Sequence, residues 1–457
     1  MLKPFLTEEL PENILHLPYF SSKVKNITKI TFTMGIKIRL TIMNFLEFFV
    51  WGAWLLSFGK YLGATLNFSG EQIGAIFMTL GIASLFMPGL MGLIADRWLS
   101  ANKLFALLHI LGAFLLYLAA KETSFDSLYL VMLLYLMLYM PTIALDNTVS
   151  YALLERNGYD IVKVFPPIRV WGTIGFIAAV WLVDIFGWSL NNYQLYFSAV
   201  FSLILGFYSL TLPDCGIEKS GEKKTFAQAM GLDALVLFKD KRMAIFLIFS
   251  MLLGAALQIT NMWGEAFLHD FGKIAIYKNT FAVRNNGILM SISQMSETLF
   301  ILSIPFFLKR FGIKKVMLMS MFAWVFRFGF FGLGEPTGFG LALLILSMII
   351  YGMAFDFFNI SGSLFVEMEV KPDIRGSAQG LFMIMTNGLG AMMGAYGSGV
   401  VVQMFTHGVG KNAIRDWPHI WFTFSAYALM VGFAFIFLFK YKHNPEEIAQ
   451  KMGEKIT

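Results

Sequence analysis

Twelve apolar stretches, each long enough to cross a bilayer, run along the chain. Their approximate ranges are 38–58, 73–94, 104–120, 127–147, 166–188, 193–213, 243–263, 286–307, 316–333, 340–360, 377–403 and 417–440. A transmembrane helix needs about 20 consecutive apolar residues to span the hydrocarbon core. The sequence therefore predicts an all-α polytopic membrane protein with twelve transmembrane helices.

Composition agrees with a chain that has lipid as part of its solvent. Of the residues, 57% are hydrophobic and only 14% are charged, and Phe alone contributes 48 residues. A soluble protein of this size needs more charge on its surface. The single cysteine, Cys215, excludes an intramolecular disulfide, and the histidines never fall at metal-ligand spacing. We expect no metal and no cofactor.

The basic residues indicate topology rather than nucleic-acid binding, because they lie in short pieces between apolar runs. Lys and Arg accumulate in cytoplasmic loops, and most fall on one side if both termini are cytoplasmic. The few assigned to outward loops are Lys60, Lys121, Lys273, Lys278, Arg284, Lys411 and Arg415. The predicted organisation is a cytoplasmic N-terminal extension (1–33), a six-helix bundle (34–213), a cytoplasmic central loop (214–242), a second six-helix bundle (243–440) and a cytoplasmic tail (441–457). The first segment could instead reflect a start codon upstream of Met34.

The ionisable residues that we single out inside the predicted spans are Glu47, Asp146, Arg169, Glu297, Arg327 and Asp356. Inserting each of these residues into the membrane costs about 2.5–3.5 kcal/mol, so each requires a charged partner, a water-filled cavity or a functional role. Arg327 lies in the ninth span, and we expect a structural role for it. The roles of Glu47 and Asp146 stay open.

Polar and aromatic residues near these charges share helix faces. The groups are Arg169, Thr173 and Phe176; Gln258 and Asn261; Gln294 and Glu297; and Tyr351 and Phe355 with Asp356 alongside. Aromatic rings, amides and carboxylates suit a flat base and ribose hydroxyls, but sugars use the same groups. Interhelical hydrogen bonds are an alternative role for the amides. The chemistry alone leaves nucleoside and sugar open.

Arg169 is charged at every accessible pH, so another group within the protein must compensate its charge. Its natural partner is a carboxylate of the second half, Asp356 or Glu297. Protonation of that carboxylate would weaken the pair and let the halves move apart. We therefore expect Asp356, Glu297 and Arg169 to couple transport to protons.

Two further features concern gating and energy. Gly92, Asp96 and Arg97 follow the second span at G-x-x-x-D-R spacing, and we expect their charges to hold cytoplasmic helix ends together. No G-x-x-x-x-G-K-[ST] sequence occurs, which disfavours ATP as the energy source. A proton or ion gradient remains.

Four segments carry a resemblance: FPPIRVWGTIGF, GLDALVLFKDKRMAIFLIFSMLLGAALQITNM, MSISQMSETLFILSIPFFL and YGMAFDFFNISGSLFVE. They resemble the nucleoside:H+ symporter family of the major facilitator superfamily, over about Met34 to Lys442. The resemblance implies the major facilitator fold and proton-coupled import of purine and pyrimidine nucleosides, such as uridine and adenosine, across a bacterial inner membrane. Its substrate and coupling positions fall on Arg169, Thr173, Phe176, Gln258, Asn261, Gln294, Glu297, Tyr351, Phe355 and Asp356. The expected partners are nucleosides, protons and the lipid bilayer, with no nucleic acid and a monomer as the working unit.

Two alternatives remain at this point. The first is a proton-coupled sugar or other small-solute symporter on the same fold. The second is an intramembrane enzyme or sensor, which is disfavoured because no nucleophile with a base, no metal set and no soluble output domain is visible.

Overall fold

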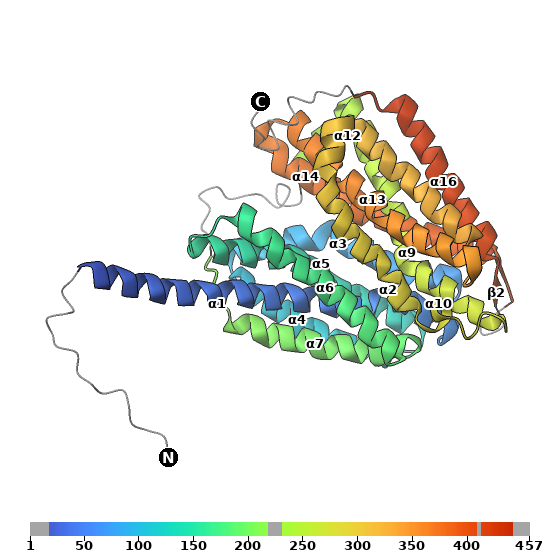
Figure 1. Ribbon diagram of the computed structural model, residues 1–457, viewed down its shortest axis with the longest axis horizontal. Helices are drawn as coiled ribbons and strands as arrows, with labels where there is room; N and C mark the ends of the chain where they lie inside the picture. The colour runs from blue at the N-terminus through green and yellow to red at the C-terminus, as the bar shows by residue number, and fades with distance from the viewer. Residues whose placement is uncertain (1–17, 218–230, 409–412, 442–457) are drawn as a thin grey trace, which may run out of the picture.

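The computed structural model describes residues 18–217, 231–408 and 413–441, and these are almost entirely helical (Figure 1). The N-terminal half contains α1 (Pro18–Gly52), α2 (Leu55–Ala64), α3 (Gly70–Arg97), α4 (Ala101–Ala119), α5 (Phe125–Arg156), α6 (Ile161–Ile185), η2 (Trp188–Leu190) and α7 (Tyr193–Thr211). The C-terminal half contains η3 (Leu232–Lys239), α9 (Lys241–Asp270), η4 (Phe271–Lys273), α10 (Phe281–Arg284), α11 (Asn286–Met290), α12 (Ile292–Leu333), α13 (Gly338–Glu369), η5 (Pro372–Ile374), α14 (Arg375–Met383), the π-helix η6 (Ile384–Gly390), α15 (Ala391–Met404) and α16 (Trp417–Leu438). Two short strands, β1 (Thr406–His407) and β2 (Ile414–Arg415), pair antiparallel.

The predicted twelve spans are confirmed, although the helices do not divide where the apolar stretches do. Ten helices in the described residues are long and apolar enough to cross a membrane. One of them, Asn286–Leu333, holds two predicted spans joined through Gly312, whose φ of 77° breaks the helical path. The predicted span 377–403 is formed by α14, η6 and α15 together. The π-helical turn interrupts this span because its hydrogen bonds reach one residue further than those of an α-helix.

The first predicted span was too short at both ends. Helix α1 already starts at Pro18, inside the predicted extension 1–33, and α2 continues the span to Ala64. Lys60 is therefore a buried helical residue, 2% exposed, and not the loop residue that its charge suggested. Residues 1–17, residues 218–230 of the predicted central loop and the predicted tail from 442 lie outside the described residues.

Several helices begin at side-chain caps that the sequence encodes locally. Ser69 and Gln72 form a reciprocal capping box at the start of α3. The Asp240 and Asp416 carboxylates accept backbone N–H groups at the starts of α9 and α16. These contacts satisfy backbone donors that have no partner in the first helical turn. They fix where the spans begin at the two membrane interfaces.

The outer faces of the helices are apolar and exposed. Phe114 on α4, Leu302 and Phe306 on α12, and Phe437 on α16 are 60%, 76%, 63% and 73% exposed. A water-soluble surface would not leave so many large apolar side chains uncovered. The exposed faces and the long apolar helices make this a multi-pass membrane protein.

The two halves converge at one end and diverge at the other. Figure 1 shows the N-terminal half, blue to green, beneath the C-terminal half, yellow to red. They meet at the end where α2, α10 and β2 lie, here called the distal end, and separate toward the end where α1 starts and α16 finishes, here called the terminal end. At the distal end α3 packs on α15 so closely that a Cβ at Gly74 would lie 2.7 Å from the Ala395 carbonyl oxygen. Only glycine permits that approach.

Candidate functional site

Arg169 lies on α6 and stacks on an aromatic ring of α1. Its Cζ is 3.8 Å from the centre of the Phe48 ring. Gly172, one turn further along α6, leaves room for both groups, because a Cβ there would lie 2.7 Å from Arg169 Nη1 and from Phe48 Cδ2. This cation–π contact holds the guanidinium in place without neutralising its charge.

The rest of the predicted α6 stripe meets an aromatic wall. Phe176 is buried and packs edge-to-face on Trp51 at 6.3 Å, and Thr173 is half-buried between Arg169 and Phe176 in sequence. Trp51 also contacts Phe48 and Tyr139, with ring centres 6.2 and 6.0 Å away. Sequence reasoning missed Phe48 and Trp51, although their spacing of three on one helix was a usable signal.

The second half contributes residues from α9, α12 and α13. Tyr351 and Asp356 on α13 are 4% exposed, while Phe355 is half-buried. Glu297 on α12 lies close enough to Asp356 for the two carboxyl charges to interact. Gln258 on α9 and Gln294 on α12 are buried, and their neighbours on the predicted faces, Asn261 and Glu297, are half-buried.

Three polar atoms in this part of the C-terminal half are buried with no hydrogen-bond partner among the described residues. They are Gln258 Nε2, Gln294 Oε1 and Asp356 Oδ2. Buried polar groups are nearly always paired, since leaving one unpaired costs about 1–3 kcal/mol. Interhelical hydrogen bonding, the alternative considered for the amides, does not account for these atoms. They are available to a polar ligand.

The charge of Arg169 is compensated by carboxylates at a distance and not by a direct ion pair. The carboxylates that act on it are Asp146, Glu297 and Glu47. Within the part of the chain that the structure describes, none of them is at ion-pair distance from the guanidinium. Glu297 belongs to the second half, so the expected interaction across the halves exists at long range. Asp356, the other predicted partner, is not among these carboxylates.

Arg327 is enclosed behind Tyr351. It is 1% exposed, its Cζ lies 4.4 Å from the centre of the Tyr351 ring, and its Nη1 donates to the Ser347 carbonyl oxygen at 2.9 Å. These contacts support the structural role expected for Arg327. It holds the ring of a predicted substrate-binding residue from behind.

A buried ion pair joins the two halves at the distal end. Lys60 Nζ on α2 lies 3.0 Å from Glu265 Oε2 on α9, and both side chains are 2% exposed. The same ammonium group donates to Asn286 Oδ1 on α11 at 2.6 Å. Sequence reasoning missed this contact because it placed Lys60 in a loop and ended the α9 span at residue 263.

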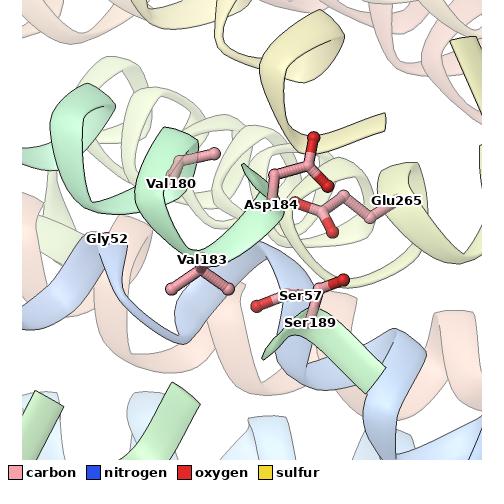
Figure 2. A pocket seen from close by; sticks show the side chains of 7 residues that line it. All are labelled: Gly52, Ser57, Val180, Val183, Asp184, Ser189 and Glu265. Atoms are coloured by element: carbon pink, nitrogen blue, oxygen red, sulfur yellow. The ribbon is translucent and has the colours of Figure 1, made fainter. Parts of the chain in front are cut away.

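Asp184 on α6 adds a second connection beside this pair. Its Oδ2 accepts the Ile288 backbone N–H of α11 at 3.1 Å. Figure 2 shows the Asp184 and Glu265 carboxyl groups near each other, and Gly287 lies against both. We call Lys60, Asp184, Glu265 and Asn286 the distal latch.

The cavity beside the latch is not the substrate site. It has about 170 Å³ of empty volume and is lined by Gly52, Ser57, Val180, Val183, Asp184, Ser189 and Glu265 (Figure 2). None of the residues predicted to bind substrate lines it.

The predicted gate motif lies at the opposite end of the protein. Gly92 has open space around it, and Asp96 and Arg97 are exposed in the last turn of α3. Arg97 follows Asp96 at the C-terminal end of this helix, where a cation is favoured by the helix dipole. Their expected action on neighbouring helix ends stays a prediction.

Comparison with known proteins agrees with this architecture. Residues 34–444 match the family model described as nucleoside H+ symporter. The chain is 53% identical to nucleoside permease NupG of Escherichia coli over 410 residues, covering 90% of this chain and 97% of that protein. It is 51% identical to xanthosine permease of Escherichia coli over 418 residues, covering 92% and 99% of the two chains. Both relatives are transport proteins, so the enzyme alternative is not supported.

Solved structures lead to the same family. The crystal structure of the nucleoside transporter NupG superposes with a TM-score of 0.84 at 53% identity, covering 89% of this chain and all of that one. A bacterial homologue of the lysosomal transporter Spinster shares the fold, with a TM-score of 0.64 at 14% identity, 89% of this chain and 96% of that one. The family match over most of the chain and the high identity to two permeases settle the assignment: this chain belongs to the nucleoside H+ symporter family.

Proposed function

We propose that this chain imports purine and pyrimidine nucleosides together with protons across a bacterial inner membrane, by alternating access. The observation that carries the proposal is the set of buried, unpartnered polar atoms on Gln258, Gln294 and Asp356. Base edges and ribose hydroxyls carry donors and acceptors that match amides and carboxylates. Nucleosides rather than sugars are supported by the family and by the two permeases that share about half of their residues with this chain.

The proposed substrate site lies between the two halves. Arg169, Thr173 and Phe176 provide its N-terminal side. The C-terminal side consists of Gln258, Asn261, Gln294, Glu297, Tyr351, Phe355 and Asp356. The aromatic rings supply stacking surfaces for a base, while amides and carboxylates bond its edge and the ribose. Phe48 and Trp51 join the N-terminal side, because Phe48 holds Arg169 and Trp51 packs on Phe176.

Glu297 and Asp356 are proposed to carry the coupled proton. Two interacting carboxyl groups in a buried place do not both ionise readily, because like charges repel and burial penalises each charge. The charge of Arg169 acts on the Glu297 carboxylate across the halves. Binding of a proton weakens that attraction and so favours separation of the halves.

The distal latch explains how the halves exchange access. With the latch formed, the two halves are joined at the distal end. We propose that the pathway is then open toward the terminal end. We propose that the terminal end faces the cytoplasm, as the distribution of Lys and Arg favours. Breaking the latch then opens the site to the outside.

One chain supplies both sides of the proposed site, so a monomer is proposed as the working unit. Reconstituting the protein with an excess of a transport-dead variant tests this point. Uptake per active chain stays constant for a monomer and falls if subunits must cooperate.

Uptake of labelled uridine into proteoliposomes, with and without an imposed inward proton gradient, tests the function. The proposal expects accumulation above equilibrium only with the gradient, and competition by unlabelled adenosine but not by sucrose. Sucrose is the relevant competitor because sucrose permease of Escherichia coli is 23% identical over 61% of this chain. If uptake is the same with and without the gradient, the protein is a facilitator and not a symporter. If sucrose competes with uridine, the sugar symporter is supported instead.

A further inference from the structure

The N-terminal half contains a buried acid–base pair that the proposed substrate site does not use. Glu47 on α1 and His109 on α4 are 0% and 1% exposed, and Glu47 Oε2 lies 2.7 Å from His109 Nε2. The other carboxylate oxygen, Oε1, contacts Thr142 Oγ1 on α5 at 2.7 Å. Three helices therefore enclose one carboxyl group deep inside the bundle.

The hydrogen bonds on the far side of His109 determine where its protons are. Ser202 Oγ on α7 donates its single hydrogen to the His109 carbonyl oxygen at 2.9 Å. The same oxygen lies 3.1 Å from His109 Nδ1. Because the hydroxyl hydrogen is already committed, Nδ1 has to carry the hydrogen of that second contact. A neutral imidazole with a hydrogen on Nδ1 has none on Nε2.

The contact between Nε2 and Glu47 then requires one more proton. An ionised carboxylate only accepts hydrogen bonds, and a bare Nε2 also only accepts. Two acceptors 2.7 Å apart repel each other unless a hydrogen lies between them. The pair thus holds one proton more than an ionised Glu47 beside a neutral His109. We place that proton on His109 Nε2, because imidazole is a stronger base than a carboxylate.

The pair faces ionisable groups of two further helices. The ionisable groups that face it are Tyr135, Tyr139 and Asp146 from α5 and Arg169 from α6, while α7 contributes the uncharged Ser202. Neither oxygen of Asp146 has a hydrogen-bond partner among the described residues. An ionised Glu47 and Arg169 carry opposite charges within this cluster. Buried clusters inside a membrane are far less costly when they are neutral overall.

The pair is connected to the proposed substrate site through α1 and α5. Glu47 directly precedes Phe48, whose ring carries Arg169. The Tyr139 ring lies between His109 and Trp51, with centres 6.1 and 6.0 Å away, and its hydroxyl donates to the Glu47 carbonyl oxygen. A change of charge at the pair therefore acts on Arg169 electrostatically and on Trp51 through packing.

We propose that Glu47 and His109 form a second proton-binding site within the N-terminal half. The proton bound there changes how strongly nearby negative charge compensates the charge of Arg169, and so changes the electrostatic effect of Arg169 on the substrate. This site is separate from Glu297 and Asp356 in the other half. The proton site stands on the contacts above, and only its effect on substrate rests on the proposed function.

Nitrogen-15 spectroscopy of ring-labelled histidine reads the proton directly and needs no substrate. The signal of His109 is identified by its loss in His109→Gln. At neutral pH we expect the wild-type His109 to show protons on both ring nitrogens, and the uncharged Glu47→Gln variant to show a neutral ring. Ser202→Ala is the control: it removes a hydrogen bond to the ring but leaves Glu47, so the doubly protonated signal remains. A neutral His109 in the wild type at neutral pH, or an unchanged signal in Glu47→Gln, overturns the proposal.

Uridine counterflow between equal pH on both sides tests the effect on substrate. Glu47→Gln removes the carboxylate that holds the proton of this pair, so the exchange rate of this variant should depend less on pH between about 5 and 8 than that of the wild type. An identical pH dependence overturns the link to Arg169 while leaving the spectroscopic result intact. Absence of uridine exchange in the wild type would instead contradict the proposed function.

Discussion

The Lys60 ammonium group lies 3.0 Å from the Glu265 carboxylate, and the two residues belong to opposite halves of the chain. Both are almost fully buried, and Lys60 also bonds Asn286 of the second half. Removing one partner of a buried pair costs about 3–5 kcal/mol, because the other charge is left without compensation. Removing one partner should therefore shift the protein toward a state in which the remaining charge reaches water.

Lys60→Met should shift the protein toward the state with an open distal end. Glu265 then loses its counter-charge, which destabilises the closed state by roughly the penalty of an unpaired buried charge. The chain has one cysteine, Cys215, so a Cys215→Ser background with Ser189→Cys gives one reporter thiol beside the latch. Labelling by a membrane-impermeant thiol reagent should accelerate about tenfold or more.

The control is Lys121→Met, which removes an exposed lysine outside the latch. It should leave the labelling rate at the background value. The double variant Lys60→Met with Glu265→Gln should recover part of the closed state, because no unpaired charge remains. Equal labelling of Lys60→Met and Lys121→Met would contradict the latch.

Asp356→Asn should abolish uphill accumulation of uridine. The amide keeps the size of the side chain and most of its hydrogen bonding but cannot carry a proton. Counterflow exchange requires no net proton movement and should persist. Glu367→Gln, at the end of the same helix and paired with Arg375 on the surface, is the matched control and should accumulate uridine normally. Undiminished accumulation in Asp356→Asn would exclude this carboxylate from coupling.

Phe48→Leu should weaken uridine binding without unfolding the protein. The substitution removes the ring beneath Arg169, and cation–π contacts contribute about 0.5–2 kcal/mol, which corresponds to about 2- to 30-fold in affinity. Equilibrium binding of labelled uridine measures the change. Phe114→Leu, on the lipid-facing side of α4, should bind as the wild type does. If the two variants bind equally well, the position of Arg169 does not depend on Phe48.

Arg327→Lys should reduce both thermal stability and uridine affinity. Lysine keeps the charge but loses the planar group that stacks on Tyr351 and bonds the Ser347 carbonyl oxygen. The ring of Tyr351 is then held less firmly, so a substrate base loses part of its stacking surface. Melting curves and binding isotherms of the variant, beside Arg310→Lys on the exposed face of the same helix, separate this effect from a general one. A melting midpoint and affinity equal to those of Arg310→Lys would contradict the structural role.

The membrane spans were predictable because hydrophobicity is a local property. Each span can be recognised from about 20 consecutive residues, independently of the rest of the chain. The caps at Ser69 and Asp416 are equally local. The prediction was inaccurate at α1–α2, where the charge of Lys60 inside a continuing helix resembled the end of a span.

Among the candidate residues, rarity was the useful signal. Arg169, Glu297 and Asp356 stood out because ionisable groups are costly in spans, and that cost holds before any fold is known. The same reasoning found Glu47 and Asp146 but gave them no role. Nothing within ten residues of Glu47 indicates that His109 is its partner.

The twelve membrane spans could be predicted from the sequence alone. So could the few polar residues whose burial inside those spans is costly. The folded chain was needed to show which side chains are in contact: Lys60 with Glu265, Glu47 with His109, and Arg169 with Phe48. It was also needed to show that Gln258, Gln294 and Asp356 each have a polar atom without a partner among the described residues. Hydrophobicity is a property of consecutive residues, so a short segment is enough to predict a span. Contacts between side chains depend on how helices far apart in the sequence are rotated and cross, and a short segment carries no information about that.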